Sequence, residues 1–347
     1  MNSRPLLSVC IPAYNRAEYL SPLLDSILQQ DFTDYEILIC EDGSPQRAAI
    51  KTIVDSYAER YAGTIRYEEN VKNLGYDGNI RQLVASARGR FCVFMGYDDL
   101  MCAGALTAIA DVVTRVKDCG VVVRTYATFD ADPNVHKQVF RYYPKEHVVA
   151  PGKGAIAVGY RRSVVIPGMV INRDAADAIA TAQFDGTLLY QLYLVGIILA
   201  KHSVVFTPSI IALRRDGTPP DFGNSESEKG KFVPQDQTPD SSVHFVAGML
   251  KIARHVEPTT ALPVFDAIRH DIGSYSYPIL SIQAKRPFGV FVRYGVALAK
   301  LGLWRSPLFH VYFLMLLVVG EARTDNLIKS IKTRLGYTPR LGSARGK

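Results

Sequence analysis

The sequence predicts an α/β fold in which a mostly parallel, doubly wound sheet carries helices on its faces and a helical C-terminal extension follows. Two observations predict it. Short apolar runs alternate with stretches of helical periodicity through the N-terminal part of the chain, which is typical of right-handed β–α–β crossovers. These runs end in polar loops, and such sheets bind ligands at the carboxyl ends of their strands. With 347 residues and 48% hydrophobic composition, the chain can bury a full core.

The first strand is expected over Leu6–Ile11, an apolar run that Pro12 closes. A loop follows, and we expect Asn15 to cap the next helix, with Glu18 three residues on as in a capping box. Leucines and isoleucines then recur at helical spacing between residues 20 and 28. The segment therefore predicts a strand, a loop and an amphipathic helix.

The pattern recurs before residue 90. The run Tyr35–Cys40 is apolar apart from Glu36 and leads into the polar residues 41–45, where Ser44 is expected to cap a helix that has Pro45 at its first position. A shorter strand is expected over residues 64–67. The polar residues 70–79 then lead into a helix expected over residues 78–87.

The next apolar run, residues 91–95, ends in Gly96, Tyr97 and two adjacent carboxylates, Asp98 and Asp99. Burying two unpaired carboxylates together is costly, so a cation or solvent must face them. Carboxylate oxygens suit Mg²⁺ or Mn²⁺ held on a nucleotide diphosphate, and no nearby His and Cys cluster indicates zinc. A solvated Asp-Asp turn after a core strand is the alternative at this point.

The first domain is assigned to residues 1–215. A helix is expected over residues 103–116, strands over 121–126, 163–171 and 204–213, and a core helix over 188–200. Residues 216–242 are rich in Gly, Pro, Ser, Asp and Lys without periodicity and predict a flexible loop or linker, a kind of segment that often serves as a lid or binds an acceptor. Residues 243–347 predict a helical, basic region with helices over 243–255, 261–283, 288–303 and 307–320.

Charge is concentrated at the C-terminal end. Residues 285–347 contain twelve Lys and Arg and two acidic residues, a net +10, which leaves −3 for residues 1–284 out of the total of +7. Residues 308–319 are apolar apart from His310, and this run is short for a transmembrane helix. Beside a basic tail it fits an element that lies on an anionic leaflet or packs against a partner, and an ordinary packed helix is the alternative.

Several classes of protein are excluded or disfavoured. The five cysteines are odd in number and form no CxxC pair, which indicates core residues in a reducing compartment. The first residues lack a signal-peptide pattern, so we expect a cytoplasmic location. No GxGxxG follows the first strand, which disfavours a dinucleotide oxidoreductase. Few aromatic residues are interleaved with the basic residues of the tail, so we do not expect nucleic acid as a partner.

Four segments taken together resemble the successive motifs of family 2 glycosyltransferases with the GT-A fold. They are Ser8–Arg16, Glu41–Ser44, Asn73–Gly75 and Gly96–Asp99, and their order and spacing match over residues 6 to about 100. The segment 75–79 is more similar to the subgroup that transfers deoxy- or dideoxyhexoses during O-antigen assembly. Gly96 departs from the family, which often has a further acidic residue at this position.

The resemblance implies roles for particular residues. Asp42 would contact the nucleotide base, and a helix N-terminal acid is its alternative role. The region Asp98-Asp99 would supply the ligand of Mg²⁺ or Mn²⁺. The other residues expected to bind the donor are Pro12, Ala13, Tyr14, Arg16 and Asn73, with Asp98 also on the donor side.

An inverting transfer also needs a general base within hydrogen-bond reach of the acceptor hydroxyl. Asp185 occupies the comparable place in the family, although Phe184 stands where the family usually has Glu. A turn or cap role is the alternative for Asp185, and helix capping accounts for two other candidates, Asp174 and Asp177.

These expectations combine into one function: an inverting, metal-dependent glycosyltransferase of cell-surface, O-antigen-like glycan synthesis. The partners expected are a nucleotide-diphosphate sugar, a glycan or polyprenyl-linked acceptor, and the cytoplasmic face of the inner membrane as a peripheral binding surface. A catalytically weak nucleotide-sugar-binding or assembly protein is the alternative. The sequence indicates no oligomeric state.

Overall fold

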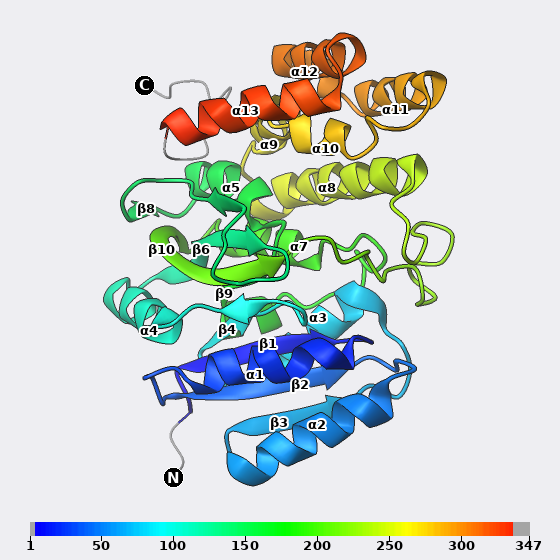
Figure 1. Ribbon diagram of the computed structural model, residues 1–347. Helices are drawn as coiled ribbons and strands as arrows, with labels where there is room; N and C mark the ends of the chain where they lie inside the picture. The colour runs from blue at the N-terminus through cyan, green and yellow to red at the C-terminus, as the bar shows by residue number, and fades with distance from the viewer. Residues whose placement is uncertain (1–3, 336–347) are drawn as a thin grey trace.

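The computed structural model describes residues 4–335, and one ten-stranded sheet runs through it (Figure 1). The strand order is β3-β2-β1-β4-β9-β6-β10-β5, with β7 paired to β6 and β8 paired to β10. The strands are β1 Leu7–Ala13, β2 Tyr35–Glu41, β3 Ile65–Glu69, β4 Phe91–Phe94, β5 Leu100–Met101, β6 Cys119–Phe129, β7 Gln138–Phe140, β8 His147–Val149, β9 Met169–Asn172 and β10 Ser203–Arg215.

The N-terminal half of the sheet is parallel, as predicted. In β1, Leu7 lies opposite Tyr35 of β2 on one side and Phe91 of β4 on the other, so the three strands end at the same edge. The whole sheet is mixed, because β9 lies antiparallel between β4 and β6. The strand predicted over residues 163–171 is correspondingly shorter, since Arg161–Ser163 forms a 3₁₀ turn and β9 begins only at Met169.

Helices cover both faces of the sheet, so the predicted α/β class is confirmed. Side chains of β1 alternate between two buried clusters, with Val9 and Ile11 in one and Cys10 in the other. Helices α1 (Leu20–Leu28), α2 (Arg47–Arg60) and α4 (Ala105–Arg115) contribute to the first cluster. The second receives α3 (Gly75–Ser86), α5 (Lys153–Gly159), α6 (Arg173–Asp177) and α7 (Tyr190–Ile198). All five cysteines are free, four of them buried.

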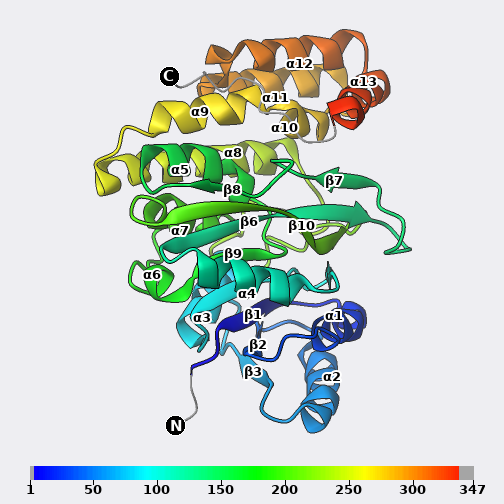
Figure 2. The same ribbon diagram turned by 90° about the vertical axis from the view of Figure 1, so that its left-hand side faces the viewer.

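The C-terminal region is helical, and it stacks on the side of the molecule opposite to β3 and α2 (Figures 1 and 2). Its elements are α8 Pro239–Thr260, α9 Phe265–Ser274, α10 Tyr277–Ser281, α11 Phe288–Lys300, η3 Leu303–Arg305, α12 Pro307–Val318 and α13 Glu321–Leu335. The segment predicted as one helix over 261–283 forms two helices, α9 and α10, with a break before Tyr277. Within the described residues, no helix combines the length and apolarity needed to cross a bilayer. The end of the predicted basic tail, residues 336–347, lies outside the described part.

Two predicted helix caps are wrong. The turn after β1 is the 3₁₀ helix η1 (Ala17–Tyr19), preceded by Arg16 in the left-handed region at φ 57°, and no side chain caps it. The Asn15 amide donates instead to Asp221, far along the chain. Helix α2 begins at Arg47, and the Ser44 hydroxyl makes no hydrogen bond within the described residues. A tertiary contact therefore replaces the cap at Asn15, whereas helix α2 begins too late for Ser44 to cap it.

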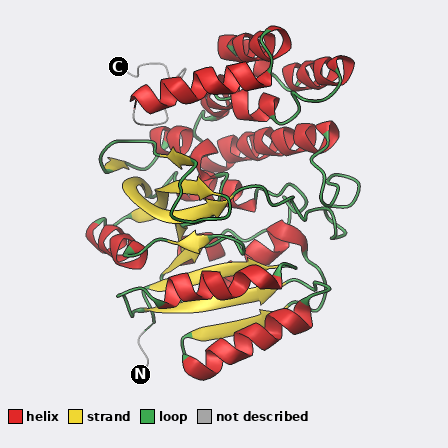
Figure 3. Ribbon diagram, in the orientation of Figure 1, coloured by secondary structure: helices red, strands yellow, loops and turns green. Residues whose placement is uncertain are grey.

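Residues 216–238 connect β10 to α8 without a helix or strand, apart from an isolated bridge between Val233 and Asp236 (Figure 3). Helix α8 begins at Pro239, so the boundary predicted at residue 242 lies inside it. We call residues 216–238 the covering segment, because its side chains line one side of the cavity at the carboxyl ends of β1, β2 and β4.

Candidate active site

A cavity of about 460 Å³ lies where β1, β2 and β4 end. Its walls come from the loops after these strands, the start of α3, the bend before β9, the start of α7, the end of β10, the covering segment and Phe245 of α8. This is the edge at which α/β sheets bind ligands. Of the predicted site residues, those that line the cavity are Pro12, Tyr14, Arg16, Asp42, Asn73, Asp98 and Asp99.

The other two predicted site residues do not line the cavity. Ala13 is fully buried as the last residue of β1, so its side chain belongs to the core beneath the loop. Asp185 forms a two-point ion pair with Arg81 of α3, and Arg81 Nη2 lies 2.9 Å from Asp185 Oδ2. The side chain expected to be the general base therefore lies in an ion pair with α3, outside the cavity lining.

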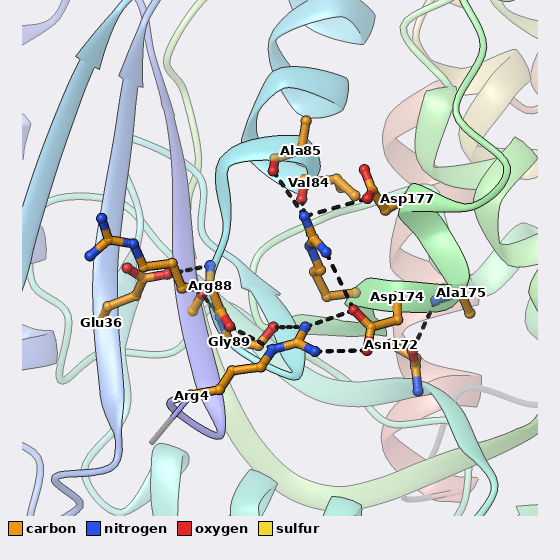
Figure 4. Close-up of polar contacts among 12 residues, drawn as sticks. Arg4, Glu36, Val84, Ala85, Arg88, Gly89, Asn172, Asp174, Ala175 and Asp177 are labelled. Carbon is orange, nitrogen blue, oxygen red and sulfur yellow. Dashed lines mark hydrogen bonds and ion pairs between the residues drawn. The ribbon is translucent and has the colours of Figure 1, made fainter. Parts of the chain in front are cut away.

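The other acidic residues considered for the base lie away from the cavity. Figure 4 shows Asp174 bonded by Arg4, whose Nη1 and Nη2 atoms each lie 2.8 Å from one of its oxygens. Arg173 contacts both Asp174 and Asp177. The hydrogen bond from Arg4 holds the pKa of Asp174 below its ordinary value. Arg4 precedes β1, so this cluster lies near the amino end of that strand, whereas the cavity lies at the carboxyl end.

Asp42, directly after β2, is buried and organises the loop before α3. Its Oδ1 accepts hydrogen bonds from Leu74 N and the Asn70 amide, both at 2.8 Å, and its Oδ2 accepts one from Gly75 N at 2.9 Å. Burial raises the pKa of Asp42 to about 6, although these donors favour the ionised form. Asp42 therefore fixes the loop 70–75 at the cavity wall, and Oδ2 keeps capacity for a further donor.

Asp98 and Asp99 face the cavity in different surroundings. Asp98 is one-fifth exposed, and its Oδ2 lies 2.9 Å from Nη1 of Arg16. Asp99 is 3% exposed, and its Oδ1 accepts a hydrogen bond from Arg215 N at 2.9 Å. Burial, together with the charge of Asp98, raises the pKa of Asp99 to about 7. The two carboxylates therefore concentrate negative charge, and only one oxygen of each accepts a hydrogen bond from the described residues.

Gly96 is the residue that lets Asp99 take this position. A Cβ atom built on Gly96 would lie 2.0 Å from Asp99 Oδ2, so any side chain there would displace the carboxylate. An acid at that position is incompatible with Asp99 where it stands.

The residue types fit a divalent metal, although among the described residues no group of three or more His, Cys, Asp or Glu is arranged to hold one. Asp98 Oδ1 and Asp99 Oδ2 accept no hydrogen bond from these residues and belong to side chains that line the cavity. Mg²⁺ and Mn²⁺ prefer such oxygens, and Mg²⁺ usually takes only one or two carboxylates beside substrate phosphates and water.

Two arginines that the sequence analysis missed also line the cavity. Arg214 and Arg215 end β10, and Arg215 donates to the main-chain oxygen of Asp98 at 3.2 Å. The guanidinium of Arg215 lies between two rings, 4.6 Å from the centroids of Tyr19 and Phe129. With Arg16, these residues place three guanidinium groups around the carboxylates, a set that can neutralise phosphate oxygens.

The covering segment is attached to the cavity wall at several points. Glu228 is buried, and its two oxygens accept hydrogen bonds from Tyr76 N at 2.7 Å and Gly223 N at 2.9 Å. The ring of Phe222 meets that of Tyr76 edge to face, with 5.7 Å between centroids. Gly75 has φ +77°, and a Cβ atom there would lie 2.4 Å from Ser225 Oγ. The glycine therefore lets the segment approach the start of α3.

Asp77, on the first turn of α3, fixes the opposite wall. It is 1% exposed and accepts hydrogen bonds from the N–H groups of Thr187, Leu188 and Tyr190 at 2.8–2.9 Å. These bonds satisfy N–H groups at the start of α7 that have no partner within the helix. Leu188 is held at φ 62° and lines the cavity. Apart from the acidic residue in an unusual motif, no local pattern predicts this role.

Comparison with known proteins bears on the fold and the family. Residues 8–177 match the sequence model described as glycosyl transferase family 2. Over 127 residues, 37% of this chain, the sequence is 36% identical to the abequosyltransferase RfbV of Salmonella typhimurium. Over 107 residues, 30% of this chain, it is 34% identical to the GalNAc(5)-diNAcBac-PP-undecaprenol beta-1,3-glucosyltransferase of Campylobacter jejuni. The matches cover 34% and 33% of these relatives, about a third of their length.

Two solved structures share the fold. S. aureus TarS 1-349 in complex with UDP-GlcNAc superposes with a TM-score of 0.60 at 15% identity, covering 99% of this chain and 95% of that one. GalNAc-T7 with UDP, GalNAc and Mn²⁺ gives a TM-score of 0.52 at 10% identity, covering 83% of this chain and 59% of that one. The fold is therefore GT-A-like, with a helical C-terminal part.

Proposed function

The chain belongs to glycosyl transferase family 2 through residues 8–177, and on this premise we propose that it transfers a sugar from a nucleotide-diphosphate donor, bound in the cavity at the ends of β1, β2 and β4. The observation that carries the proposal is the convergence, in one cavity, of seven residues that the sequence motifs single out. Asp42 and the Asp98-Asp99 pair come from loops after different strands, yet all three line the same space.

The cavity offers groups suited to each part of such a donor. Tyr14 lines the wall next to Asp42 and presents a ring on which a base can stack, while Asp42 Oδ2 can accept from a base N–H. Arg16, Arg214 and Arg215 surround the place where two phosphates would lie. Departure of the nucleoside diphosphate develops negative charge on its β-phosphate, and these guanidinium groups would stabilise that charge.

A divalent cation, Mg²⁺ or Mn²⁺, is part of the proposal. Asp98 and Asp99 would hold it, and when bound it would supply further positive charge to the leaving diphosphate. Support comes from the two carboxylate oxygens without hydrogen bonds and from the Mn²⁺ in the GalNAc-T7 complex. Arg16 keeps Asp98 in place, and Gly96 leaves room for Asp99.

The inverting course implied by the sequence resemblance remains part of the proposal. Its general base would be a carboxylate that lines the cavity, since Asp185 is paired with Arg81 outside it. The carboxylates in the wall beyond Asp42, Asp98 and Asp99 are Asp221 and Glu228, both on the covering segment. Asp221 and Glu228 are therefore the candidates for the general base.

The proposed acceptor is a lipid-linked or polysaccharide glycan of O-antigen-like synthesis, used at the cytoplasmic face of the inner membrane. Names of the relatives support it, since one is an abequosyltransferase and another acts on an undecaprenol-linked glycan. The C-terminal helices add a surface suited to lipid. On α12, Val311, Leu314 and Val318 form an exposed stripe at helical spacing, with exposed fractions of 47%, 57% and 82%.

Basic residues accompany this apolar stripe. Arg293, Lys300 and Arg305 are exposed on α11 and η3, and between residues 285 and 320 the sequence has no acidic residue. Apolar side chains with basic residues nearby are the composition of surfaces that bind anionic lipid.

The alternative function, a nucleotide-sugar-binding or assembly protein without turnover, would use the same cavity.

The experiment that tests the proposal combines binding with turnover. Purified protein is screened for thermal stabilisation by UDP-, GDP-, dTDP- and CDP-sugars, each with Mg²⁺ or Mn²⁺, because a bound ligand raises the melting temperature by mass action. We expect one nucleotide class to stabilise the protein and its diphosphate to be released slowly without acceptor and faster with a lipid-linked glycan. Binding without any release would favour the assembly protein.

A further inference from the structure

Beyond the donor-binding residues, the wall formed by the start of α7 and by residues 164–167 contains one buried polar side chain. Only one of its two polar atoms has a hydrogen-bond partner. Gln191 is 1% exposed and lines the cavity. Its Nε2 donates to the main-chain oxygen of Val164 at 2.8 Å, whereas its Oε1 accepts no hydrogen bond from the described residues. A buried amide oxygen without a donor is costly, so such atoms usually serve a purpose.

The orientation of this amide is fixed by its surroundings. Because Nε2 must face the Val164 carbonyl, the opposite end of the amide is the oxygen. Gln191 lies on the first turn of α7, directly after the backbone that Asp77 holds through Thr187, Leu188 and Tyr190. The position of Oε1 is therefore set by two independent anchors rather than by a flexible side chain.

The main-chain oxygens of residues 164–167 already have donors. The oxygen of Val165 accepts from Arg124 Nη2 at 2.6 Å, that of Pro167 accepts from Arg124 Nε, and that of Ile166 accepts from Met169 N at 2.8 Å. Together with Gln191, these donors occupy all four carbonyls of this segment. Gln191 Oε1, in contrast, has no donor among the described residues.

The side chains around Gln191 are apolar. The cavity-lining residues of this wall other than Gln191 are Val164, Val165, Ile166, Pro167 and Leu188. Such surroundings strengthen a hydrogen bond made inside them and penalise a polar group that finds no partner. A ligand that fits this part of the cavity should therefore present one hydroxyl toward Gln191 and otherwise apolar surface.

We propose that Gln191 is a specificity-determining residue, whose Oε1 accepts a hydrogen bond from one hydroxyl of the transferred sugar. The proposal rests on the proposed function. It adds a residue that recognises the sugar, as distinct from those that bind the nucleotide. Nucleoside diphosphate alone does not carry this hydroxyl, so its binding should be independent of Gln191. The contribution of this hydrogen bond should appear only as a difference between the binding affinity for the nucleotide sugar and that for the nucleoside diphosphate.

The test compares these two ligands in wild type and in Gln191→Leu, which keeps the volume and removes the acceptor. The nucleotide class is the one identified by the thermal screen of UDP-, GDP-, dTDP- and CDP-sugars, and affinities are measured by calorimetry with Mn²⁺. We expect the affinity for the nucleoside diphosphate to be unchanged and the affinity for its sugar conjugate to fall about tenfold.

Gln30→Leu is the matched control. Gln30 is an amide on the other side of the sheet whose Nε2 donates to Ser26 and Cys102 and whose Oε1 accepts from Leu106 N, so its loss should alter neither affinity. Equal affinity of Gln191→Leu and wild type for the nucleotide sugar would overturn the inference. If Gln191→Leu does not fold, Gln191→Met is measured in the same way and decides between the same two outcomes. Failure of every nucleotide and nucleotide sugar to bind wild type would overturn the proposed function and this inference with it.

Discussion

Arg81 and Asp185 meet in a two-point ion pair, with Arg81 Nη2 2.9 Å from Asp185 Oδ2 and Nη1 bonded to Oδ1. The pair joins α3 to the turn before α7 and lies outside the cavity wall. The resemblance in sequence had implied that Asp185 is the general base. In the structure this carboxylate has the guanidinium of Arg81 as its partner, so we expect a structural role for it.

The first prediction concerns this pair. Asp185→Asn should retain kcat for sugar transfer within about tenfold of wild type, because removal of a true base costs about 10²–10⁴-fold. Steady-state release of nucleoside diphosphate in the presence of acceptor measures it. Arg81→Met serves as the control, since it removes the other half of the same contact and should have a similar effect. A 10²-fold loss confined to Asp185→Asn, with donor affinity intact, would restore the base assignment.

The second prediction concerns stability and pH. Burial raises the pKa of Asp77 to about 6 from an ordinary value of 3.8. Between these two values the folded state binds the proton more tightly than the unfolded chain does. The wild type should therefore lose stability relative to Asp77→Asn as pH rises from about 4 to about 6, by at most about 3 kcal/mol at 1.36 kcal/mol per pKa unit.

Urea unfolding of both proteins at pH 4.5 and pH 7 measures this difference. Asp174→Asn is the control, because the pKa of Asp174 is lowered and its contribution is lost only at more acidic pH. If the free energy of unfolding changed equally with pH in wild type and Asp77→Asn, burial would not raise the pKa of Asp77, and the prediction would be contradicted.

The third prediction concerns Gly96. Because a Cβ atom there would lie 2.0 Å from Asp99 Oδ2, Gly96→Ala should displace the carboxylate and weaken nucleotide binding with Mn²⁺ about tenfold. Gly154→Ala is the matched control, since a Cβ atom at Gly154 meets its nearest neighbour at 3.9 Å. Calorimetric titration of both variants checks it, and an unchanged affinity in Gly96→Ala would mean that Asp99 moves at no cost.

The fourth prediction concerns the membrane. The triple variant Val311→Ser, Leu314→Ser, Val318→Ser should bind vesicles that contain phosphatidylglycerol about tenfold more weakly than wild type, because it removes the exposed apolar stripe of α12. Val135→Ser is the control, since Val135 is 61% exposed in the turn before β7. Co-sedimentation measures binding, and equal binding of the triple variant would exclude α12 as the lipid-binding element.

Much of the candidate site could be predicted because parallel strands end at one edge. Tyr14, Asp42 and Asp98 each follow a strand of the parallel half, so the alternation of strands and helices was enough to bring them together. The fold class followed from the same alternation. The prediction of a mostly parallel sheet is confirmed, since the strands β1, β2, β4, β6 and β10 run in one direction. Nothing local reveals that the short β9 lies antiparallel between β4 and β6.

The rest of the site depends on contacts between distant segments. Asp77 looks like a helix-start acid in sequence, yet its partners are 110–113 residues away. Glu228 lies in a segment without periodicity, and this pattern predicted a flexible linker. In the structure both of its carboxylate oxygens accept hydrogen bonds, one of them from Tyr76 N of α3. Gln191 sits in an apolar run that indicated only a core helix. Such roles follow from tertiary structure and have no local signature.

The central claim is that Asp98 and Asp99 hold a divalent cation against the diphosphate of a nucleotide sugar. Calorimetric titration of that nucleotide sugar into wild type, Asp98→Asn and Asp99→Asn, with and without Mn²⁺, tests it most directly. We expect Mn²⁺ to tighten binding to wild type at least about tenfold, and each variant to lose most of this gain while it keeps the metal-free affinity. An equal gain in all three proteins, or no gain in wild type, would contradict it.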